Sequence, residues 1–472
     1  MILSPARWYA LAWQSRLAAL IPLQLFQGLY LPVLTPFLSL LFWFASGLLF
    51  LALFPPAGAA ARRSFFLSLL LFVLSPLLLG RIYYQGAGIG ENAALCCFLL
   101  GTLYTVRKTR LLSFFAAVAL FTFSLGVNPC ILNTFWTLLL LLLLTSLITR
   151  EDRHIFQYCC AFGVALLLYL VAVKLLIPAR PFYNNQVAGA GAFLKNILPQ
   201  LKASLAYFWQ TQPPMNRLFK IVFSLICLGG FAALLARPKR GRRVRLLFSV
   251  SLPRDSVFLR LVLILLLVLT HNISAYVSGD AIANTFNLRM DYYSVPFLLS
   301  FCALAVLGSP GLTGRLFAAA AAVLVVLSMG ADVRALQVWK ISIDDDILYA
   351  NRMLARIEAS PGFDAARSWR ILALGERPAI GERFWQGYQR RSLELQRAQH
   401  LGRNFAEVFN YIAPQLKISN FTGERPELCA RHKAFLDAAP AWPSPGSLKV
   451  EGEEGLILVV LDRAAARRYC VR

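Results

Sequence analysis

Six ionisable residues stand next to apolar segments of the chain and have side chains suited to chemistry on a lipid-linked phosphate. They are Arg16, Arg81, Arg289, Glu91, Asp280 and Asp291. An arginine guanidinium can hold a phosphate through two parallel hydrogen bonds. A carboxylate beside a bound sugar can take a proton from a hydroxyl group and so act as a general base. We therefore predict that the three arginines contact phosphate and that the three acids activate an acceptor.

Each of these residues also has a simpler interpretation as an anchor at the membrane surface. Long charged side chains at the end of a membrane span often extend toward the headgroup region without binding a substrate. Asp280, Arg289 and Asp291 lie within one short segment, residues 278–291, which favours a functional interpretation of this group.

No motif of a soluble enzyme or of a metal site is present in the sequence. It contains no P-loop, no GxSxG elbow, no HExxH and no Rossmann fingerprint. The consecutive acids Asp344–Asp346 fall in a predicted helix, where successive side chains point about 100° apart and do not converge on one ion. The nine cysteines show no metal-binding spacing. We predict no metal site and no cofactor, and the sequence leaves open whether a divalent cation takes part.

The elements that must position the candidate residues are apolar helices. Of the 472 residues, 58% are hydrophobic and 15% are charged, and the mean hydropathy of +0.61 is far above that of a soluble domain. Apolar runs of helical length predict an all-α polytopic membrane bundle with about ten transmembrane helices. The predicted spans are Thr35–Phe54, Ser64–Gly80, Ala93–Val106, Leu111–Val127, Cys130–Ile148, Ile155–Ile177, Leu218–Ala236, Val257–Val277, Tyr292–Gly308 and Leu316–Gly330.

Clusters of basic residues in alternate loops predict the orientation of the bundle. The strongest, Arg237–Arg245, contains six positive charges and no acid. Arg62-Arg63, Arg107–Arg110, Arg150–Arg153 and Arg315 fall in loops on the same side. Because positive residues in short loops stay in the cytoplasm, all five loops are predicted to face it. A basic run can also bind nucleic acid, but apolar segments on both sides of this one favour topology, and we predict no nucleic-acid partner.

The opposite loops are therefore predicted to face the periplasm. They include residues 178–216, where apolar residues at helical spacing predict an amphipathic helix along the membrane surface. Residues 1–34 fall on this side too. Their mixed polarity is compatible with a poor span or with an interfacial segment, and we favour the interfacial segment. With ten spans, this orientation leads us to expect one further span before them, unless Trp8–Leu34 is that span.

Residues 331–472 have the composition of an ordinary globular domain, and we predict a small α/β domain outside the cytoplasm. Asp332–Glu358 reads as a helix, and Trp369–Gly375 and Leu456–Leu461 read as buried strands. Cys429 and Cys470 are the two cysteines of this part. In an oxidising compartment, two such cysteines are more often a disulfide than a reactive pair, so we predict that they are bonded.

Several stretches carry a resemblance to a known family. They are Trp13–Arg16, Ser75–Tyr84, Ser124–Cys130 and, in the C-terminal domain, Val333–Ile357 with Arg370–Gly375 and Trp442–Ser447. In this order and spacing they resemble the type II O-antigen glucosyltransferases, the serotype-converting Gtr proteins of bacteria and their phages. The family's acidic pair in its first external loop has no counterpart here, Tyr84-Gln85 stands where an aromatic-Asp pair is common, and Asn128-Pro129 replaces a Tyr-Gln pair.

The resemblance implies a GT-C-like fold and a function. Such a protein would move a hexose, glucose by the resemblance, from a polyprenyl-phosphate carrier to O-antigen or another cell-envelope glycan. The reaction would take place on the outer face of the bacterial inner membrane, with the C-terminal domain in the periplasm. Two alternatives remain open: a flippase or transporter of lipid-linked sugars, and an inactive or truncated relative that acts as a scaffold in envelope assembly.

Overall fold

The computed structural model describes most of the helical part of the chain. The described residues are 34–55, 61–75, 85–107, 110–128, 131–148, 154–176, 199, 217–236, 244–247, 250–252, 257–270, 294–309, 311–374, 409, 412–413, 415–421 and 425–470. All but the last residue of the predicted interfacial segment 1–34, all but one residue of the loop 178–216 and most of the basic loop 237–245 lie outside them. The chain divides into two compact units, one ending at Asp332 and the other beginning at Val333.

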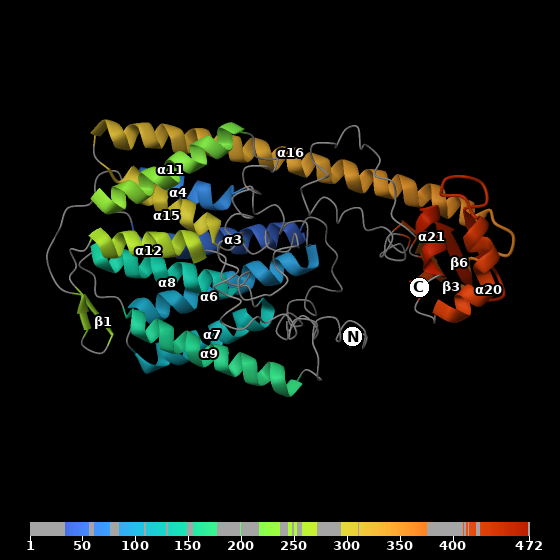
Figure 1. Ribbon diagram of the computed structural model, residues 1–472, viewed down its shortest axis with the longest axis horizontal. Helices are drawn as coiled ribbons and strands as arrows, with labels where there is room; N and C mark the ends of the chain where they lie inside the picture. The colour runs from blue at the N-terminus through green and yellow to red at the C-terminus, as the bar shows by residue number, and fades with distance from the viewer. Residues whose placement is uncertain are drawn as a thin grey trace. The chain divides into compact units, whose positions relative to one another are not determined.

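The first unit is a bundle of apolar helices (Figure 1). Its helices are α3 (Leu34–Leu53), α4 (Ala61–Val73), α6 (Gln85–Arg107), α7 (Leu111–Val127), α8 (Ile131–Ile148), α9 (Ile155–Leu176), α11 (Arg217–Ala236), α12 (Val257–Thr270), α15 (Val295–Leu307) and the first part of α16 (Gly311–Glu358). Each overlaps one of the apolar segments expected from the sequence. The helical membrane class is therefore supported by the structure.

Four helical segments are long and apolar enough to cross a membrane. They are Ile131–Ile148, Ile155–Leu175, Arg217–Ala236 and Gly311–Val333. The shorter apolar helices among the described residues are Phe37–Leu53, Leu111–Val127, Val257–Thr270 and Val295–Leu307. The chain is thus a membrane protein by length and composition of its helices, while the count of ten spans stays a prediction.

Two groups of aromatic rings hold the bundle together. Trp43 of α3 stacks on Phe72 of α4 with ring centroids 4.5 Å apart, and Phe297 of α15 meets Phe72 edge-on at 5.1 Å. In the second group, Phe135 of α8 stacks on Phe162 of α9 at 3.8 Å. Aromatic pairs stabilise a core beyond the area that they bury. The contact of Phe72 with Phe297 ties α4 to α15, which is far from it in the sequence, and the other two join neighbouring helices of the chain.

Close packing between α11 and α15 depends on a residue without a side chain. A Cβ atom built on Gly230 would lie 2.5 Å from the Cβ and 2.6 Å from the Cα of Cys302. Small residues let membrane helices approach closely, and close packing is a main source of helix association in a bilayer.

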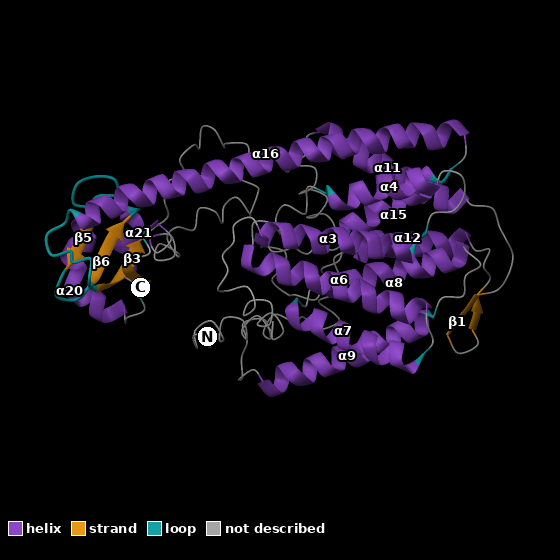
Figure 2. Ribbon diagram, turned by 180° about the vertical axis from the view of Figure 1, so that it is seen from behind, coloured by secondary structure: helices purple, strands orange, loops and turns teal. Residues whose placement is uncertain are grey.

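The second unit contains a four-stranded sheet in the order β4-β3-β6-β5 (Figure 2). Its strands are β3 (Ser368–Leu374), β4 (Lys417–Asn420), β5 (Leu448–Glu451) and β6 (Leu456–Val460). β3 is parallel to both β4 and β6, and β5 is antiparallel to β6. The two strands expected from the sequence are β3 and β6, which are the two central strands.

Helices cover both faces of this sheet. Met353 and Ile357 of α16 form one core with Trp369 and Val459. On the other face, α20 (Arg425–Ala438) and α21 (Arg463–Tyr469) contribute to a core with Leu458 and its neighbours in β6. All five residues of β6 are buried, as expected for a strand covered on both sides. The predicted α/β organisation is therefore present.

Two details differ from the sequence-based expectation. The segments Leu316–Gly330 and Asp332–Glu358 form one continuous helix, α16, because Gly330 weakens a helix by only about 1 kcal/mol and no proline or capping residue follows it. A short antiparallel hairpin, β1 (Val244–Leu247) and β2 (Val250–Leu252), begins at the end of the segment that the charge pattern treats as a loop.

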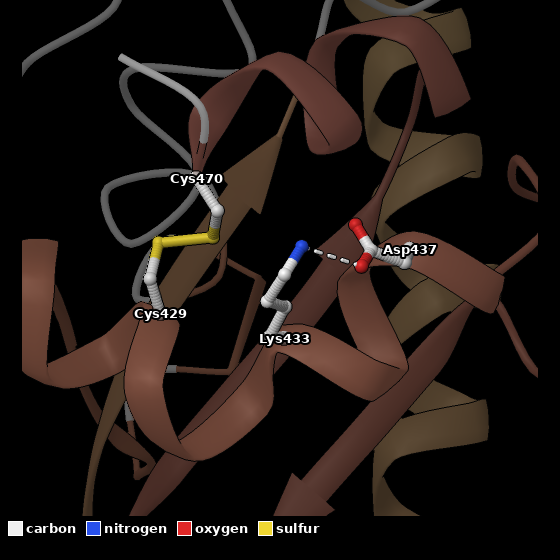
Figure 3. Close-up of a disulfide and its surroundings, with 4 residues drawn as sticks. All are labelled: Cys429, Lys433, Asp437 and Cys470. Carbon is white, nitrogen blue, oxygen red and sulfur yellow. Dashed lines mark hydrogen bonds and ion pairs between the residues drawn. A yellow bond between two sulfur atoms is a disulfide. The ribbon is translucent and has the colours of Figure 1, made fainter.

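A disulfide joins Cys429 of α20 to Cys470, just after α21, with the sulfur atoms 2.11 Å apart (Figure 3). This is the pair expected from the sequence. On the same helix, Nζ of Lys433 lies 2.7 Å from Oδ2 of Asp437. This ion pair is exposed, lies within α20 and is worth little, whereas the disulfide links α20 to the residue that follows α21.

Replacing Gly230 with alanine should destabilise the bundle. The new methyl group would meet backbone and Cβ atoms of Cys302, which cannot rotate away, and overpacking of this kind costs about 1–3 kcal/mol. Gly163 of α9 is the matched control, because a Cβ atom placed on it would have nothing within 4 Å. Thermal unfolding of the full chain in detergent should show a lower Tm for Gly230→Ala and an unchanged or higher one for Gly163→Ala. Equal behaviour of the two variants would contradict the packing.

Replacing both Cys429 and Cys470 with serine should destabilise the second unit. The bridge closes a loop of sequence separation 41, and the chain-entropy relation gives about 4 kcal/mol for a loop of this length. Denaturant unfolding of the full chain, compared with the wild type under non-reducing conditions, measures the loss. If thiol labelling of the unfolded wild type modifies both cysteines without prior reduction, the bridge does not form.

Candidate functional site at the polar end of the bundle

Of the six candidate residues for chemistry, the structure describes Glu91. Arg16, Arg81, Arg289, Asp280 and Asp291 lie outside the described residues. Glu91 is partly buried near the start of α6. The candidate site is therefore built outward from the start of this helix.

Buried polar side chains are concentrated around this end of the bundle. Those nearest to it are Ser39, Asn92, Ser124, Asn128, Asn133, Thr134, Thr137 and Thr270. They come from the start of α3, α6 and α8 and from the end of α7 and α12. We call these residues together the polar end. Since water is scarce in a bilayer core, such groups must find partners within the protein or in a ligand.

Asn92 links α6 to α3 at the polar end. Its Nδ2 donates hydrogen bonds to the backbone oxygen of Ser39 at 3.1 Å and to the hydroxyl oxygen of Ser39 at 2.8 Å. Both residues are buried. Because Glu91 precedes Asn92 in the same helix, these bonds fix the helix that carries the candidate acid.

Ser124 connects the end of α7 to the start of α6. Its hydroxyl group lies 2.8 Å from the backbone oxygen of Ala94 and 2.7 Å from that of Leu120. The backbone N–H of Asn128 donates to the oxygen of Ser124 at 2.9 Å and closes α7. The ends of α3, α6 and α7 are therefore joined by a short series of polar contacts.

Trp136 connects α8 to α12 across a long stretch of sequence. Its Nε1 donates to Oγ1 of Thr270 at 2.5 Å, and that hydroxyl group lies 2.5 Å from the backbone oxygen of Leu266. Beside Trp136 in α8, Oγ1 of Thr137 is buried and has no hydrogen-bond partner among the described residues. Near the start of α8, Trp136 is therefore held by its hydrogen bond to Thr270, whereas the hydroxyl group of Thr137 can still form a hydrogen bond.

Lys220 is a buried basic residue near the start of α11. Its side chain is 1% exposed. The guanidinium of Arg260, in α12, donates to the backbone oxygen of Leu234 at 3.2 Å and sets the antiparallel register of the two helices. Because the two helices are antiparallel, the level of Lys220 follows from its separation from Leu234 along α11. Lys220 lies about one turn further than Thr270 toward that end of the bundle. A basic group therefore lies on the same side of the bundle as the polar end.

The opposite end of the bundle is richer in arginine. Among the described residues, Arg62, Arg63, Arg107, Arg110, Arg260 and Arg315 lie close to the helix ends on that side. Arg107 donates to the backbone oxygen of Ala52, and Arg260 donates to that of Leu234. These two arginines donate hydrogen bonds to backbone oxygens in the last turns of α3 and α11, which have no partner within the helix, so we assign them structural roles. The distribution agrees with the orientation predicted from the charge pattern, which stays a prediction.

A separate titratable group lies in the second unit. Oε2 of Glu454 is 3.3 Å from Nε2 of His432, and Oε1 is 3.3 Å from the guanidinium of Arg431. Burial alone would raise the pKa of Glu454, but the hydrogen bonds from these two residues outweigh it and lower that pKa. Arg367 and Arg370 bind backbone oxygens of residues 452–454. The group holds the β5–β6 turn.

The sequence-based selection of site residues missed most of the polar end. Asn92 could have been found as a polar residue beside Glu91 in an apolar run. The pairing of Trp136 with Thr270 carries no local signal, since the residues are 134 positions apart. Among the described residues, no three His, Cys, Asp or Glu side chains are grouped so that they could hold a metal ion.

Replacing Asn92 with alanine should destabilise the bundle by about 1–3 kcal/mol, because two buried acceptors lose their donor. A double-mutant cycle with Ser39→Ala should give a coupling energy above about 0.5 kcal/mol in thermal unfolding. Thr122→Ala is the control, since the Thr122 hydroxyl bonds within its own helix to Val118. Additive effects of Asn92→Ala and Ser39→Ala would contradict a direct link between α3 and α6.

Comparison with known proteins found no matching family model, no matching curated protein and no matching solved structure.

Proposed function

We propose that this protein is a membrane hexosyltransferase that acts on a polyprenyl-phosphate-linked sugar. The acceptor is O-antigen or another cell-envelope glycan, and the resemblance noted in the sequence makes glucose the expected hexose. The observation that supports the proposal best is the polar end, a group of buried polar side chains at one end of the bundle, with Glu91 beside it. A lipid-linked sugar has the matching construction, with an apolar tail and a polar head.

Exposed apolar side chains on the flank of the bundle suit the lipid part of such a substrate. On α9, Leu167, Leu170 and Leu175 are 62%, 52% and 77% exposed. These surfaces are stable in a bilayer, where a polyprenyl chain also resides. A substrate moving within the bilayer would therefore reach the protein with its phosphate at the level of a helix end.

In the proposed reaction, Arg16, Arg81 and Arg289 hold the phosphate, and Glu91, Asp280 and Asp291 act on the acceptor. A carboxylate takes the proton of an acceptor hydroxyl as its oxygen attacks the anomeric carbon, and positive groups stabilise the phosphate that leaves. The reaction site lies on the outer face of the bacterial inner membrane, and the second unit lies in the periplasm. Both placements follow from the charge pattern of the loops.

The distribution of buried polar groups favours transfer over transport of the whole lipid-linked sugar. A flippase needs a polar route through the bilayer for the sugar head. In the described part of the bundle, the region between the two ends contains the aromatic groups around Phe72 and Phe162. The hydroxyl groups of Ser46 and Thr102 there bond to backbone oxygens of their own helices and are already occupied, whereas that of Ser68 has no partner among the described residues.

The proposal can be tested with the full chain in liposomes containing polyprenyl-phosphate glucose and an acceptor glycan. Glu91→Gln and Arg289→Ala should each lower transfer by about 100-fold or more, since each removes a group acting on the reacting atoms. The control is Glu358→Gln, which changes an exposed acid in α16. Unaltered transfer in Arg289→Ala would remove that residue from the site. Movement of the lipid-linked sugar across the bilayer without transfer would support a flippase, and neither activity would support a scaffold.

A further inference from the structure

Exposed arginines gather at the end of the bundle opposite the polar end. We call Arg62, Arg63, Arg107, Arg110 and Arg315 together the arginine rim, and all five side chains are exposed. Arg107 donates a hydrogen bond to a backbone oxygen of α3. The other four make no hydrogen bond or ion pair with any residue that the structure describes. Their guanidinium groups are therefore available to an anion from outside the chain.

Contacts between α4 and α15 place the arginines of α4 and α16 at the same end of the bundle. The hydroxyl group of Ser300 in α15 donates to the backbone oxygen of Ser68 in α4 at 3.1 Å, and Phe297 meets Phe72 edge-on. The residue numbers rise along α4 as they fall along α15, so the two helices are antiparallel. The start of α4 is therefore level with the end of α15, and α16 begins shortly after that end.

The segments that adjoin these helix ends contain far more bases than acids. Fifteen lysines and arginines but only three aspartates and glutamates occur in residues 55–63, 107–110, 149–154, 237–256 and 309–315. Charges of one sign repel each other and destabilise a compact structure. The three acids cannot neutralise the excess, so this end of the bundle requires anions that the chain does not supply.

Two arginines of the rim stand beside apolar side chains that point out of the bundle. Arg62 and Phe66 are four positions apart in α4, and Leu312 and Arg315 are three apart in α16, so each pair shares a helix face. Phe66 is 59% exposed and Leu312 is 71% exposed. Such side chains are stable against the acyl chains of a bilayer, and a neighbouring guanidinium then reaches the headgroups. A free phosphate or a nucleic acid has no part that matches the apolar neighbour.

We propose that the arginine rim is a binding surface for anionic phospholipids. The guanidinium groups hold the headgroup phosphates through paired hydrogen bonds, and the apolar side chains beside them contact the acyl chains. Basic groups at a membrane surface attract anionic lipids in this way. The inference does not depend on the proposed transfer reaction. Bound anionic lipid offsets the repulsion among the arginines, so the bundle is more stable with such lipid than without it.

The test measures lipid binding to the full chain in a neutral detergent by native mass spectrometry. The wild type is titrated with phosphatidylglycerol and with phosphatidylcholine of the same acyl chains, and it should prefer phosphatidylglycerol. A variant with Arg62→Gln, Arg63→Gln and Arg315→Gln should bind phosphatidylglycerol about tenfold or more weakly, because three contacts to phosphate are lost. Its binding of phosphatidylcholine should fall much less, so the preference should largely disappear.

A matched control removes the same number of positive charges from the second unit. Arg352→Gln, Lys417→Gln and Arg463→Gln change three exposed residues there, and this variant should keep the wild-type preference for phosphatidylglycerol. Thermal unfolding then separates lost binding from a folding defect. In neutral detergent alone, the rim variant should have a Tm equal to or above that of the wild type, since like charges are removed. Added phosphatidylglycerol should raise the Tm of the wild type more than that of the rim variant.

Four results would each overturn the inference. Equal binding of the two lipids by the wild type would show that the rim does not select anionic headgroups. An equal loss in the control variant would show that only the net charge matters. A lower Tm of the rim variant in neutral detergent would assign these arginines a structural role. Inorganic phosphate that raised the Tm of the wild type as much as phosphatidylglycerol would show a site for any phosphate rather than for a lipid.

Discussion

The arrangement of this protein depends on hydrogen bonds that buried polar groups of the apolar bundle make inside the protein. In a bilayer core an unsatisfied donor or acceptor costs several kcal/mol. Hydroxyl groups along the helices meet this need locally, as Thr102 does by bonding to the backbone oxygen of Phe98 at 2.9 Å. At the polar end the same need is met between helices, by Asn92 with Ser39 and by Trp136 with Thr270. Local bonds leave a helix independent of its neighbours, whereas bonds between helices fix their relative positions.

This difference has a consequence for catalysis. A transferase must hold its reacting groups within a fraction of an ångström, which requires support from surrounding side chains. In the proposed transferase, the interhelical bonds near Glu91 would supply such support, and the aromatic contact of Trp43 with Phe72 would add to it. The end of the bundle rich in arginine shows a different use of polar groups. There, arginines bond to free backbone oxygens at helix ends, as Arg107 does with Ala52, and these oxygens are left unpaired by helix geometry alone.

The helical segments could be read from the sequence because an apolar run of helical length has few alternatives. The strands β3 and β6 were predictable for a related reason, since central strands covered on both faces are continuously apolar. The edge strands β4 and β5 are short and mixed in polarity, and they were not predicted. The pairing of Cys429 with Cys470 followed from their location in one domain. For the candidate site, Glu91 was predicted to stand in the loop before the span Ala93–Val106, whereas α6 begins at Gln85 and contains it. Its supporting contacts join positions that only the folded chain brings together.

Asp332 shows why a pattern can hide a partly buried acid. In the sequence it stands at a change of composition, from an apolar run to a polar segment, and an acid at that point suggests the start of a soluble domain. The continuity of α16 changes this interpretation, because the helix carries the apolar face of Ala321 and Leu324 through Gly330 to Asp332 without a turn. The carboxylate therefore continues the face of α16 that packs against the bundle, where a charged group is costly.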